Sequence, residues 1–297
     1  MRVCAIDVGT NTVTSIVADV GGGRLDVLED EERFARLGQG VDASGRLAPE
    51  AMERALDRLA GAQATAERLG AERTVIGATS ASRDARNVGV LVERVRDELG
   101  LDYRVISGVQ EAALSFRGAL ALLPGVERAT VVDVGGGSTE VVTGTKAGGV
   151  GYRTSLDVGS VRLTERHFAV RPVSPEAARA AEADVTATLA TVERARLAGP
   201  VVATGSVARL LARLAGAGGA APHVPIGDVT VWRERLLALT PAEARALAPE
   251  VLTGREDVAA AAVLTLETAI RGLGGAGYVA TRGGLRHGLA LAAGEEA

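Results

Sequence analysis

The chain has 297 residues, of which 47% are hydrophobic and 24% are charged, a balance typical of a folded globular protein with one large or two ordinary domains. A net charge of -4 and an aromatic content of 2% argue against nucleic-acid binding, and no apolar run reaches the roughly 18 residues of a membrane span. Cys4 is the one cysteine, which excludes a disulfide framework and a thiolate metal cluster. The N-terminus runs directly into a strand pattern, so we expect a cytoplasmic protein.

The first half of the chain alternates between strand and helix patterns. Residues 3–17 form two apolar runs around Asp7-Val8-Gly9-Thr10-Asn11, which predicts a strand, a tight turn and a second strand. Pro49 suits the first turn of a helix, and Gly70 stops the helical spacing that follows. The further elements expected here are a strand over 24–31, a helix over 50–69, a strand over 74–79, a helix over 80–99, a strand over 103–106 and a helix over 107–122, capped by Ser107.

The second half repeats this alternation, which indicates an α/β protein. Ser174 and Pro175 are typical of a helix start, and Thr240-Pro241-Ala242-Glu243 spells a capping box. The elements expected here are a hairpin over 131–142, a turn over 157–160, a helix over 176–197, a strand over 201–204, a helix over 207–214, a loop over 216–225, a helix from 241, a helix over 259–270, a strand over 278–281 and a helix over 284–293.

The hairpin at 131–142 carries Asp133, three glycines, two hydroxyl residues and Glu140. Glycine permits positive φ and close ligand approach, and consecutive N–H groups in such a turn form a nest for an anion such as phosphate. Two flanking carboxylates can hold Mg²⁺ against phosphate oxygens. A bare hairpin turn uses the same residues, but a second Asp-x-Gly hairpin at Asp7 and Gly9, about half a chain earlier, suggests two similar lobes facing each other across a phosphate.

Several stretches carry a family resemblance by their order and spacing: Asp7–Thr12, Ala78–Asn87, Ile106–Ala112, Asp133–Glu140, Leu156–Glu165 and Gly284–Arg286. Together they resemble the Ppx/GppA family of exopolyphosphatases and guanosine pentaphosphate phosphohydrolases, a hydrolase branch of the actin-like ATPase and sugar kinase superfamily. The resemblance implies two ribonuclease-H-like lobes, at residues 1–124 and 125–297, with the last helix at about 284–295 packing back on the first lobe. Longer family members add a helical region without a counterpart here, so we expect a preference for short polyphosphate chains.

The resemblance also implies roles for individual residues. Glu111 corresponds to the catalytic base that prepares water, and Arg83 to an arginine that contacts the phosphate chain. Asp7, Asp133 and Glu140 correspond to carboxylates that help hold Mg²⁺, with Mn²⁺ as the alternative metal. The two nests and a residue of the 157–160 turn complete the expected phosphate site: Gly9, Thr10, Asn11, Gly135, Gly136, Gly137, Ser138, Thr139 and Ser160.

Simpler explanations remain open for some of these residues. By its position alone, Glu111 is more typical of a helix N-terminal carboxylate stabilised by the helix dipole than of a catalytic base. Glu140 is compatible with a solvent-facing strand residue, and Ser160 with an ordinary turn. Arg282 and Arg286 are further candidates for distal phosphates, because arginine binds phosphate with a bidentate fork.

The sequence therefore predicts a phosphoanhydride hydrolase that releases orthophosphate from the ends of inorganic polyphosphate, at a site in an interlobe cleft. The alternatives are a guanosine pentaphosphate 5'-phosphohydrolase, an ATP-dependent kinase of the same superfamily, and a non-catalytic polyphosphate or nucleotide sensor. Retention of Glu111 favours an enzyme over a sensor, and the low aromatic content weakens a stacked guanine pocket. The expected partners are inorganic polyphosphate and guanosine penta- or tetraphosphate, without nucleic acid or membrane, and a homodimer stays open.

Overall fold

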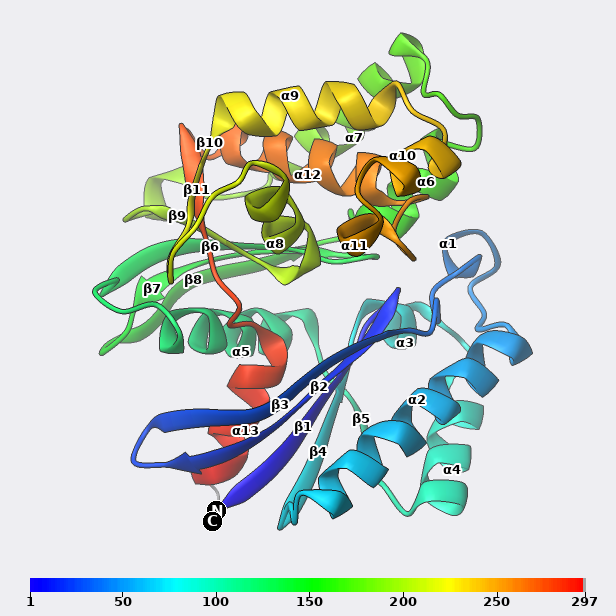
Figure 1. The fold of residues 1–297 in the computed structure, drawn as a ribbon, viewed down its shortest axis with the longest axis vertical. Coiled ribbons are helices and arrows are strands. Elements are labelled where there is room, and N and C mark those ends of the chain that lie inside the picture. The colour runs from blue at the N-terminus through cyan, green and yellow to red at the C-terminus, as the bar shows by residue number, and fades with distance from the viewer. Residues whose placement is uncertain (296–297) are drawn as a thin grey trace. The chain divides into compact units, whose positions relative to one another are not determined.

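The computed structural model describes residues 1–295, which divide into two compact units. The first unit is Met1–Ala121 together with the segment from Gly283 onward, and the second is Leu122–Arg282. The chain thus leaves the first unit close to the expected position of residue 124. Helix α13 (Leu285–Glu295), red in Figure 1, packs against β1, β2 and α5 of the first unit.

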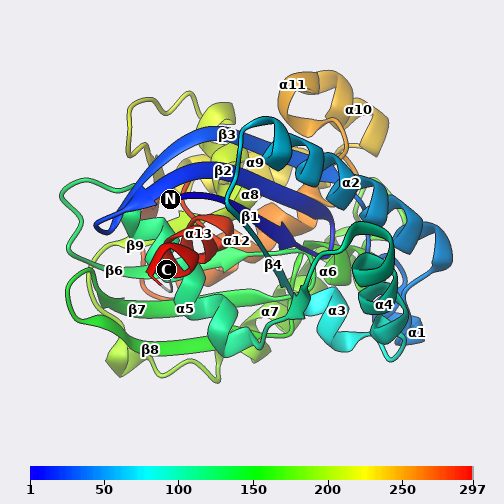
Figure 2. The same ribbon diagram turned by 90° about the horizontal axis from the view of Figure 1, so that it is seen from below.

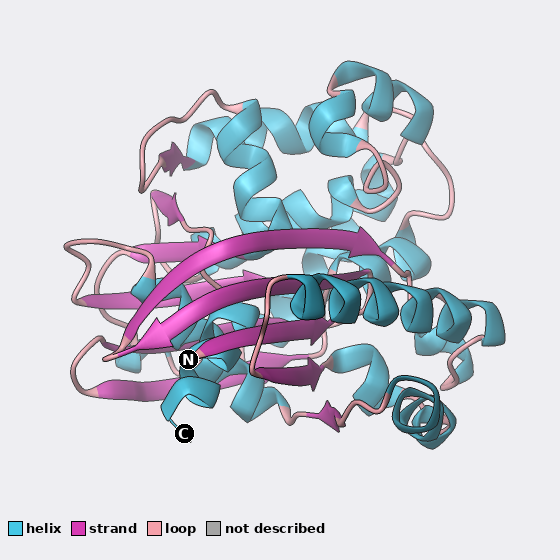
Figure 3. Cartoon of the chain, turned by 60° about the horizontal axis from the view of Figure 1, so that its bottom comes forward, coloured by secondary structure: helices cyan, strands magenta, loops and turns pink. Residues whose placement is uncertain are grey.

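A five-stranded mixed sheet in the order β3-β2-β1-β4-β5 forms the centre of the first unit. β1 pairs antiparallel with β2 and parallel with β4, and a bulge between Val17 and Ala18 interrupts the pairing of β2 with β3. Figure 3 shows the N-terminal strands as long, curved ribbons, in keeping with the twist that a bulge adds. The strands are β1 (Arg2–Val8), β2 (Thr12–Gly21), β3 (Arg24–Phe34), β4 (Arg73–Ala78) and β5 (Tyr103–Val105).

Helices cover both faces of this sheet, which explains why the centre of β1, from Val3 to Ile6, is apolar and fully buried. Cys4 and Ile6 pack in the core cluster that contains α2, whereas Val3 and Ala5 pack in the cluster that contains α13. Figure 1 shows α2 on one side of the sheet and α13 on the other. The remaining helices of this unit are α1 (Val41–Ser44), α2 (Pro49–Arg68), α3 (Ser80–Asp84), α4 (Val88–Leu99) and α5 (Gly108–Ala121).

The second unit repeats the same strand order as β8-β7-β6-β9-β11, with β10 added at the edge. β6 pairs antiparallel with β7 and parallel with β9, as β1 pairs with β2 and β4. Figure 2 shows β6, β7 and β8 running side by side. This duplicated topology confirms the two ribonuclease-H-like lobes. The strands are β6 (Arg128–Val134), β7 (Thr139–Thr145), β8 (Gly149–Leu156), β9 (Val201–Thr204), β10 (His223–Pro225) and β11 (Gly277–Ala280).

The core of the second unit is organised around α12 (Ala259–Gly272), which is buried from Ala259 to Ile270. This helix contacts α6, α7, α8, α9 and β6, so its small alanine side chains allow neighbours to approach on every side. Within residues 1–295, no helix has both the length and the apolar character needed to cross a bilayer. The other helices are α6 (Ser160–His167), α7 (Pro175–Leu189), a 3₁₀ turn (Arg194–Arg196), α8 (Gly205–Leu214), α9 (Ile226–Leu237), α10 (Pro241–Leu247) and α11 (Pro249–Leu252).

The helix expected over 80–99 is interrupted between α3 and α4. The side chain of Asn87 accepts a hydrogen bond from the N–H of Leu47 at 2.8 Å and donates one to the carbonyl of Leu47 at 3.0 Å. The N–H of Arg86 donates to the carbonyl of Gly45 at 3.0 Å instead of to a helical carbonyl. These bonds to a distant loop outweigh local helix propensity.

The helix expected over 176–197 ends at Leu189. Past that point the N–H of Glu193 donates to the hydroxyl of Tyr152 at 3.0 Å, and Val192 is buried in the core. Tertiary contacts therefore redirect the chain. Helix α9 (Ile226–Leu237) is not among the elements expected from the sequence. The capping box at Thr240 and Glu243 is confirmed, because both of its reciprocal hydrogen bonds are present.

Candidate active site

The turn between β6 and β7 has the geometry of an anion nest. The N–H of Gly135 donates to the carbonyl of Ser138 at 2.9 Å and closes the turn. In residues 1–295, the N–H groups of Gly136, Gly137 and Ser138 have no backbone acceptor. Three consecutive donors at one turn are suited to the oxygens of a phosphate group.

The turn between β1 and β2 has the same construction. The N–H of Gly9 donates to the carbonyl of Thr12, again at 2.9 Å, and Asp7 lies directly opposite Thr14 in the register. In the second hairpin the corresponding pair is Asp133 and Glu140. The two hairpins therefore match in their internal hydrogen bond, and the second one carries an additional carboxylate.

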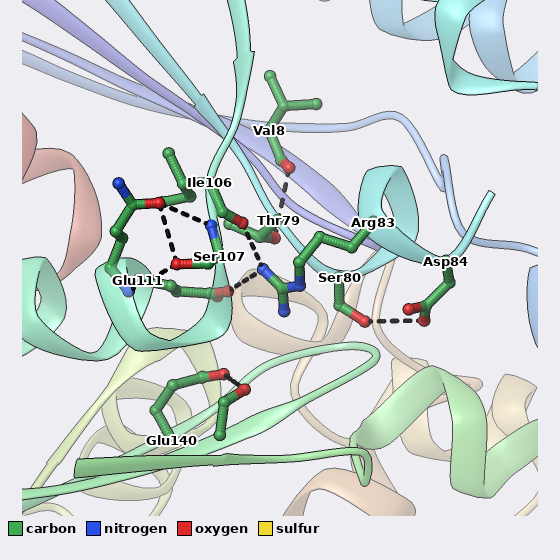
Figure 4. Close-up of polar contacts among 11 residues, drawn as sticks. Val8, Thr79, Ser80, Arg83, Asp84, Ile106, Ser107, Glu111 and Glu140 are labelled. Atoms are coloured by element: carbon green, nitrogen blue, oxygen red, sulfur yellow. Dashed lines mark hydrogen bonds and ion pairs between the residues drawn. The ribbon is translucent and has the colours of Figure 1, made fainter. Parts of the chain in front are cut away.

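Asp133 and Glu140 provide oxygen donors suited to a hard divalent cation. Opposed residues of antiparallel strands project from the same face, so both carboxylates lie on one side of β6 and β7. Glu140 is 1% exposed, so it is not the solvent-facing residue that its sequence allowed, and Ser155 Oγ donates to its Oε1 at 2.7 Å (Figure 4). Gly205, with φ of 81°, lets the start of α8 approach Asp133, because a Cβ there would lie 2.9 Å from Asp133 Oδ1.

This donor set fits Mg²⁺ with the help of other ligands. Within residues 1–295 there is no group of three or more His, Cys, Asp or Glu side chains arranged to hold a metal. Mg²⁺ commonly binds one or two carboxylates and completes its shell with water and substrate phosphate oxygens. Asp7 belongs to the first unit, where it accepts a hydrogen bond from Thr14 Oγ1 at 3.3 Å.

Glu111 lies in the first turn of α5 and is paired with Arg83. Arg83 Nη1 donates to Glu111 Oε2 at 2.6 Å and to the carbonyl of Ile106 at 3.1 Å (Figure 4). The side chains of Glu111 and Arg83 are 10% and 21% exposed. The guanidinium of Arg83 forms a charge-assisted hydrogen bond that holds the carboxylate of Glu111 in place.

A capping box fixes the helix that carries Glu111. Gln110 Oε1 accepts hydrogen bonds from the N–H and Oγ of Ser107, and the N–H of Gln110 donates back to Ser107 Oγ at 3.3 Å (Figure 4). The predicted Ser107 cap is therefore confirmed, and Gln110 is its reciprocal partner. The Ser107-x-x-Gln110 spacing is a sequence signal that would have revealed this role.

The other residues assigned to phosphate binding lie around the two turns. Ser160 begins α6, and both its N–H and its Oγ donate to the carbonyl of Gly135, at 2.9 and 3.3 Å. Thr139 Oγ1 donates to the carbonyl of Val158 at 2.6 Å. In the first hairpin, the carbonyls of Thr10 and Asn11 accept hydrogen bonds from the backbone of residues 35–38. These residues therefore brace the turns in addition to any contact with phosphate.

The arginines considered for distal phosphates differ in their surroundings. Arg286 is 7% exposed and donates through Nε and Nη2 to the two carboxylate oxygens of Asp30, both at 3.0 Å. This bidentate pair ties α13 to β3. Arg282 is exposed. No sequence pattern indicates Ser155 as the partner of Glu140, because that contact depends on the pairing of β7 with β8.

The model of the Ppx/GppA phosphatase family matches residues 12–295. The chain belongs to this family. Exopolyphosphatase 2 of Mycobacterium tuberculosis is 38% identical to it, with 92% of this chain and 91% of that protein covered. The guanosine-5'-triphosphate,3'-diphosphate pyrophosphatase of Vibrio atlanticus is 35% identical over 57% of this chain and 34% of that protein.

Solved structures of Ppx/GppA proteins share the whole fold. An exopolyphosphatase from Cytophaga hutchinsonii has a TM-score of 0.89 at 25% identity, with 100% of this chain and 98% of that chain covered. The Aquifex aeolicus member of the Ppx/GppA family has a TM-score of 0.81 at 25% identity, with the same coverage of both chains. The likeness to family members thus extends over both units of the fold.

Proposed function

We propose that this Ppx/GppA protein is an exopolyphosphatase, which hydrolyses the terminal phosphoanhydride bond of inorganic polyphosphate and releases orthophosphate. The observation that carries the proposal is the shielded Glu111–Arg83 pair in a chain that shares 38% identity with an exopolyphosphatase over nearly its full length. A carboxylate held in place by a guanidinium and largely shielded from bulk water can act as a general base.

The residues divide the reaction between them. Glu111 takes a proton from the attacking water, a role that contributes roughly 10²- to 10⁴-fold to the rate. The N–H groups of Gly136, Gly137 and Ser138 bind phosphate oxygens in the ground state and in the transition state. Arg83, once a polyanion is present, is close enough to the base to share its charge between Glu111 and a phosphate oxygen.

We further propose that Asp133 and Glu140 hold Mg²⁺, with Mn²⁺ as the alternative. When bound, the ion would neutralise charge on the phosphate oxygens. Removal of divalent cations with EDTA should therefore abolish phosphate release, and Mg²⁺ should restore it. Full activity in EDTA would contradict this assignment.

The deciding experiment measures phosphate release from short polyphosphate, long polyphosphate, guanosine pentaphosphate and ATP. Glu111→Gln should lower release from polyphosphate by at least about 100-fold. Glu93→Gln is the matched control, because Glu93 is an exposed carboxylate of the same unit. Comparison of short with long polyphosphate tests the expected preference for short chains.

Guanosine pentaphosphate is the second candidate substrate, on the strength of the Vibrio atlanticus relative. Release from guanosine pentaphosphate alone would move the assignment to that reaction. If no phosphate is released from any of the four compounds but polyphosphate still binds, the result would support a sensor. Transfer of phosphate from ATP to an acceptor would instead indicate a kinase.

A further inference from the structure

The peptide geometry of the 135–138 turn makes its N–H groups dependent on its carbonyls. In a planar trans peptide, the carbonyl of one residue and the N–H of the next point in opposite directions. A hydrogen bond that holds the carbonyl of Gly136 therefore also fixes the direction of the N–H of Gly137. Any element that binds all the carbonyls of this turn determines where its donors point.

The first turn of α6 binds three consecutive carbonyls of this turn. The N–H of Ser160 donates to the carbonyl of Gly135 at 2.9 Å, and the N–H of Val161 donates to the carbonyl of Gly136 at 2.8 Å. Arg162 Nε donates to the carbonyl of Gly137 at 2.9 Å. Each of these carbonyls shares its peptide plane with the N–H of the next residue. The N–H groups of Gly136, Gly137 and Ser138 must therefore point away from α6.

Gly159 makes this close approach sterically feasible. A Cβ on Gly159 would lie 2.6 Å from both the carbonyl carbon and the carbonyl oxygen of Gly136, so a larger side chain would separate α6 from the turn. The approach also has an electrostatic effect. The positive end of α6 and the guanidinium of Arg162 polarise the peptides from the carbonyl side, which strengthens their N–H groups as donors.

The first unit shows the same arrangement with different residues. The carbonyl of Thr10 accepts from the N–H of Gly38 at 2.8 Å, and the carbonyl of Asn11 accepts from the N–H of Arg36 at 2.8 Å. Arg36 has φ of 50°, a left-handed conformation that is unfavourable for a residue with a Cβ. In each unit, a segment outside the hairpin therefore holds the carbonyls of the Asp-x-Gly turn.

We propose that Arg162 is a positioning residue of the phosphate site, which acts by orienting the peptide between Gly137 and Ser138 and not by contact with the substrate. This inference rests on the proposed function of the nest. The basis is that the bond to the carbonyl of Gly137 comes from the side chain of Arg162, whereas the carbonyls of Gly135 and Gly136 are held by backbone N–H groups, with a longer bond from Ser160 Oγ in addition. A substitution of Arg162 can therefore remove the hydrogen bond to the carbonyl of Gly137 without changing the main chain.

Replacement of Arg162 by methionine keeps much of the aliphatic stem and removes the donor. Arg162→Lys keeps a cationic donor, and Arg166→Met removes an exposed positive charge near the end of the same helix as a control. For polyphosphate hydrolysis, we expect Arg162→Met to raise KM about tenfold with a much smaller change in kcat. The reason is that the nest binds phosphate in the ground state as well as in the transition state. Arg162→Lys should recover most of the loss, and Arg166→Met should resemble the wild type.

The ligand-free proteins give the readout that separates positioning from direct binding. In Arg162→Met, the ¹³C signal of the Gly137 carbonyl and the amide signal of Ser138 should move, because the hydrogen bond at that peptide is lost. A titration with inorganic pyrophosphate should then show weaker binding at the amide signals of the turn. If Arg162→Met does not fold, the Gly137 carbonyl signal and the Ser138 amide signal are compared between Arg162→Lys and the wild type. The lysine ammonium differs from the guanidinium in length and geometry, so these two signals should move in Arg162→Lys as well.

An unchanged Gly137 carbonyl signal together with a raised KM would overturn the proposal, since it would mean that Arg162 meets the substrate directly. Unchanged signals, KM and pyrophosphate affinity would overturn it as well. If the wild type binds pyrophosphate at these amides but releases no phosphate from any substrate, the proposed function fails. The pyrophosphate titration of the variants would still decide the role of Arg162.

Discussion

Removal of Arg83 should leave the carboxylate of Glu111 buried without its cation. The two side chains are 10% and 21% exposed and are joined at 2.6 Å, so the pair is closer to a buried ion pair than to a surface one. Loss of one partner of a buried pair typically costs about 3–5 kcal/mol, against about 0–1 kcal/mol for an exposed pair. Because Arg83 is partly exposed, we expect Arg83→Met to cost about 3 kcal/mol. At ~2–4 °C per kcal/mol, the unfolding temperature should fall by about 6–12 °C.

Thermal unfolding at neutral pH measures this effect. The double variant Arg83→Met/Glu111→Gln should be more stable than Arg83→Met alone, because it contains no buried charge at this position.

Arg104→Met provides the control for the loss of a cation. Arg104 pairs with Asp102 at 2.6 Å, but these side chains are 67% and 71% exposed, so the loss should stay below about 1 kcal/mol. The reasoning would be refuted if Arg83→Met were as stable as Arg104→Met, or if the double variant were no more stable than Arg83→Met.

Three further predictions concern packing, reactivity and the second carboxylate. Gly288→Ala should lower the stability by about 1–3 kcal/mol in thermal unfolding, because its Cβ would lie 2.0 Å from the carbonyl of Leu114, and an unchanged melting curve would show that α13 can shift at no cost. Burial raises the pKa of the Cys4 thiol to about 12. Iodoacetamide at pH 8 should therefore label Cys4 in urea and not in the native protein. Rapid labelling of the native protein would contradict this. Ser155→Ala should lower the stability in thermal unfolding by about 1–3 kcal/mol, because Glu140 loses a hydrogen-bond donor while it stays buried. Ser155→Thr keeps the hydroxyl and should lower the stability less. Equal losses in the two variants would show that this hydrogen bond is unimportant.

Local signals made the two hairpins predictable. Asp-x-Gly between apolar runs determines a strand, a turn and a strand through the conformational freedom of glycine, and the repetition of this pattern half a chain later is enough to indicate two lobes. The role of Arg162 was not accessible in this way. Its partner is the carbonyl of Gly137, and because every residue has a backbone carbonyl, the sequence does not indicate which one Arg162 binds. The packing of α6 against the turn brings the two together.

The pairing of Arg83 with Glu111 shows the same limit. The sequence motifs indicate both residues but give them separate roles. β4 and β5 are parallel neighbours, so the segments that follow them meet at one edge of the sheet, and this places Arg83 beside Glu111. A correct strand order would have predicted the contact, whereas the interruption of the helix before α4 would still have required knowledge of the loop at Leu47.

The place of α13 in the first unit has a consequence for the nascent chain. Ala290, Leu291 and Ala293 cover one face of β1 and β2, yet a ribosome makes them after the whole of Leu122–Arg282. The whole sequence of the second unit is therefore synthesised before the helix that covers the apolar face of the N-terminal sheet. Translation that stops before Gly283 would release a molecule with one folded unit and one uncovered, aggregation-prone sheet.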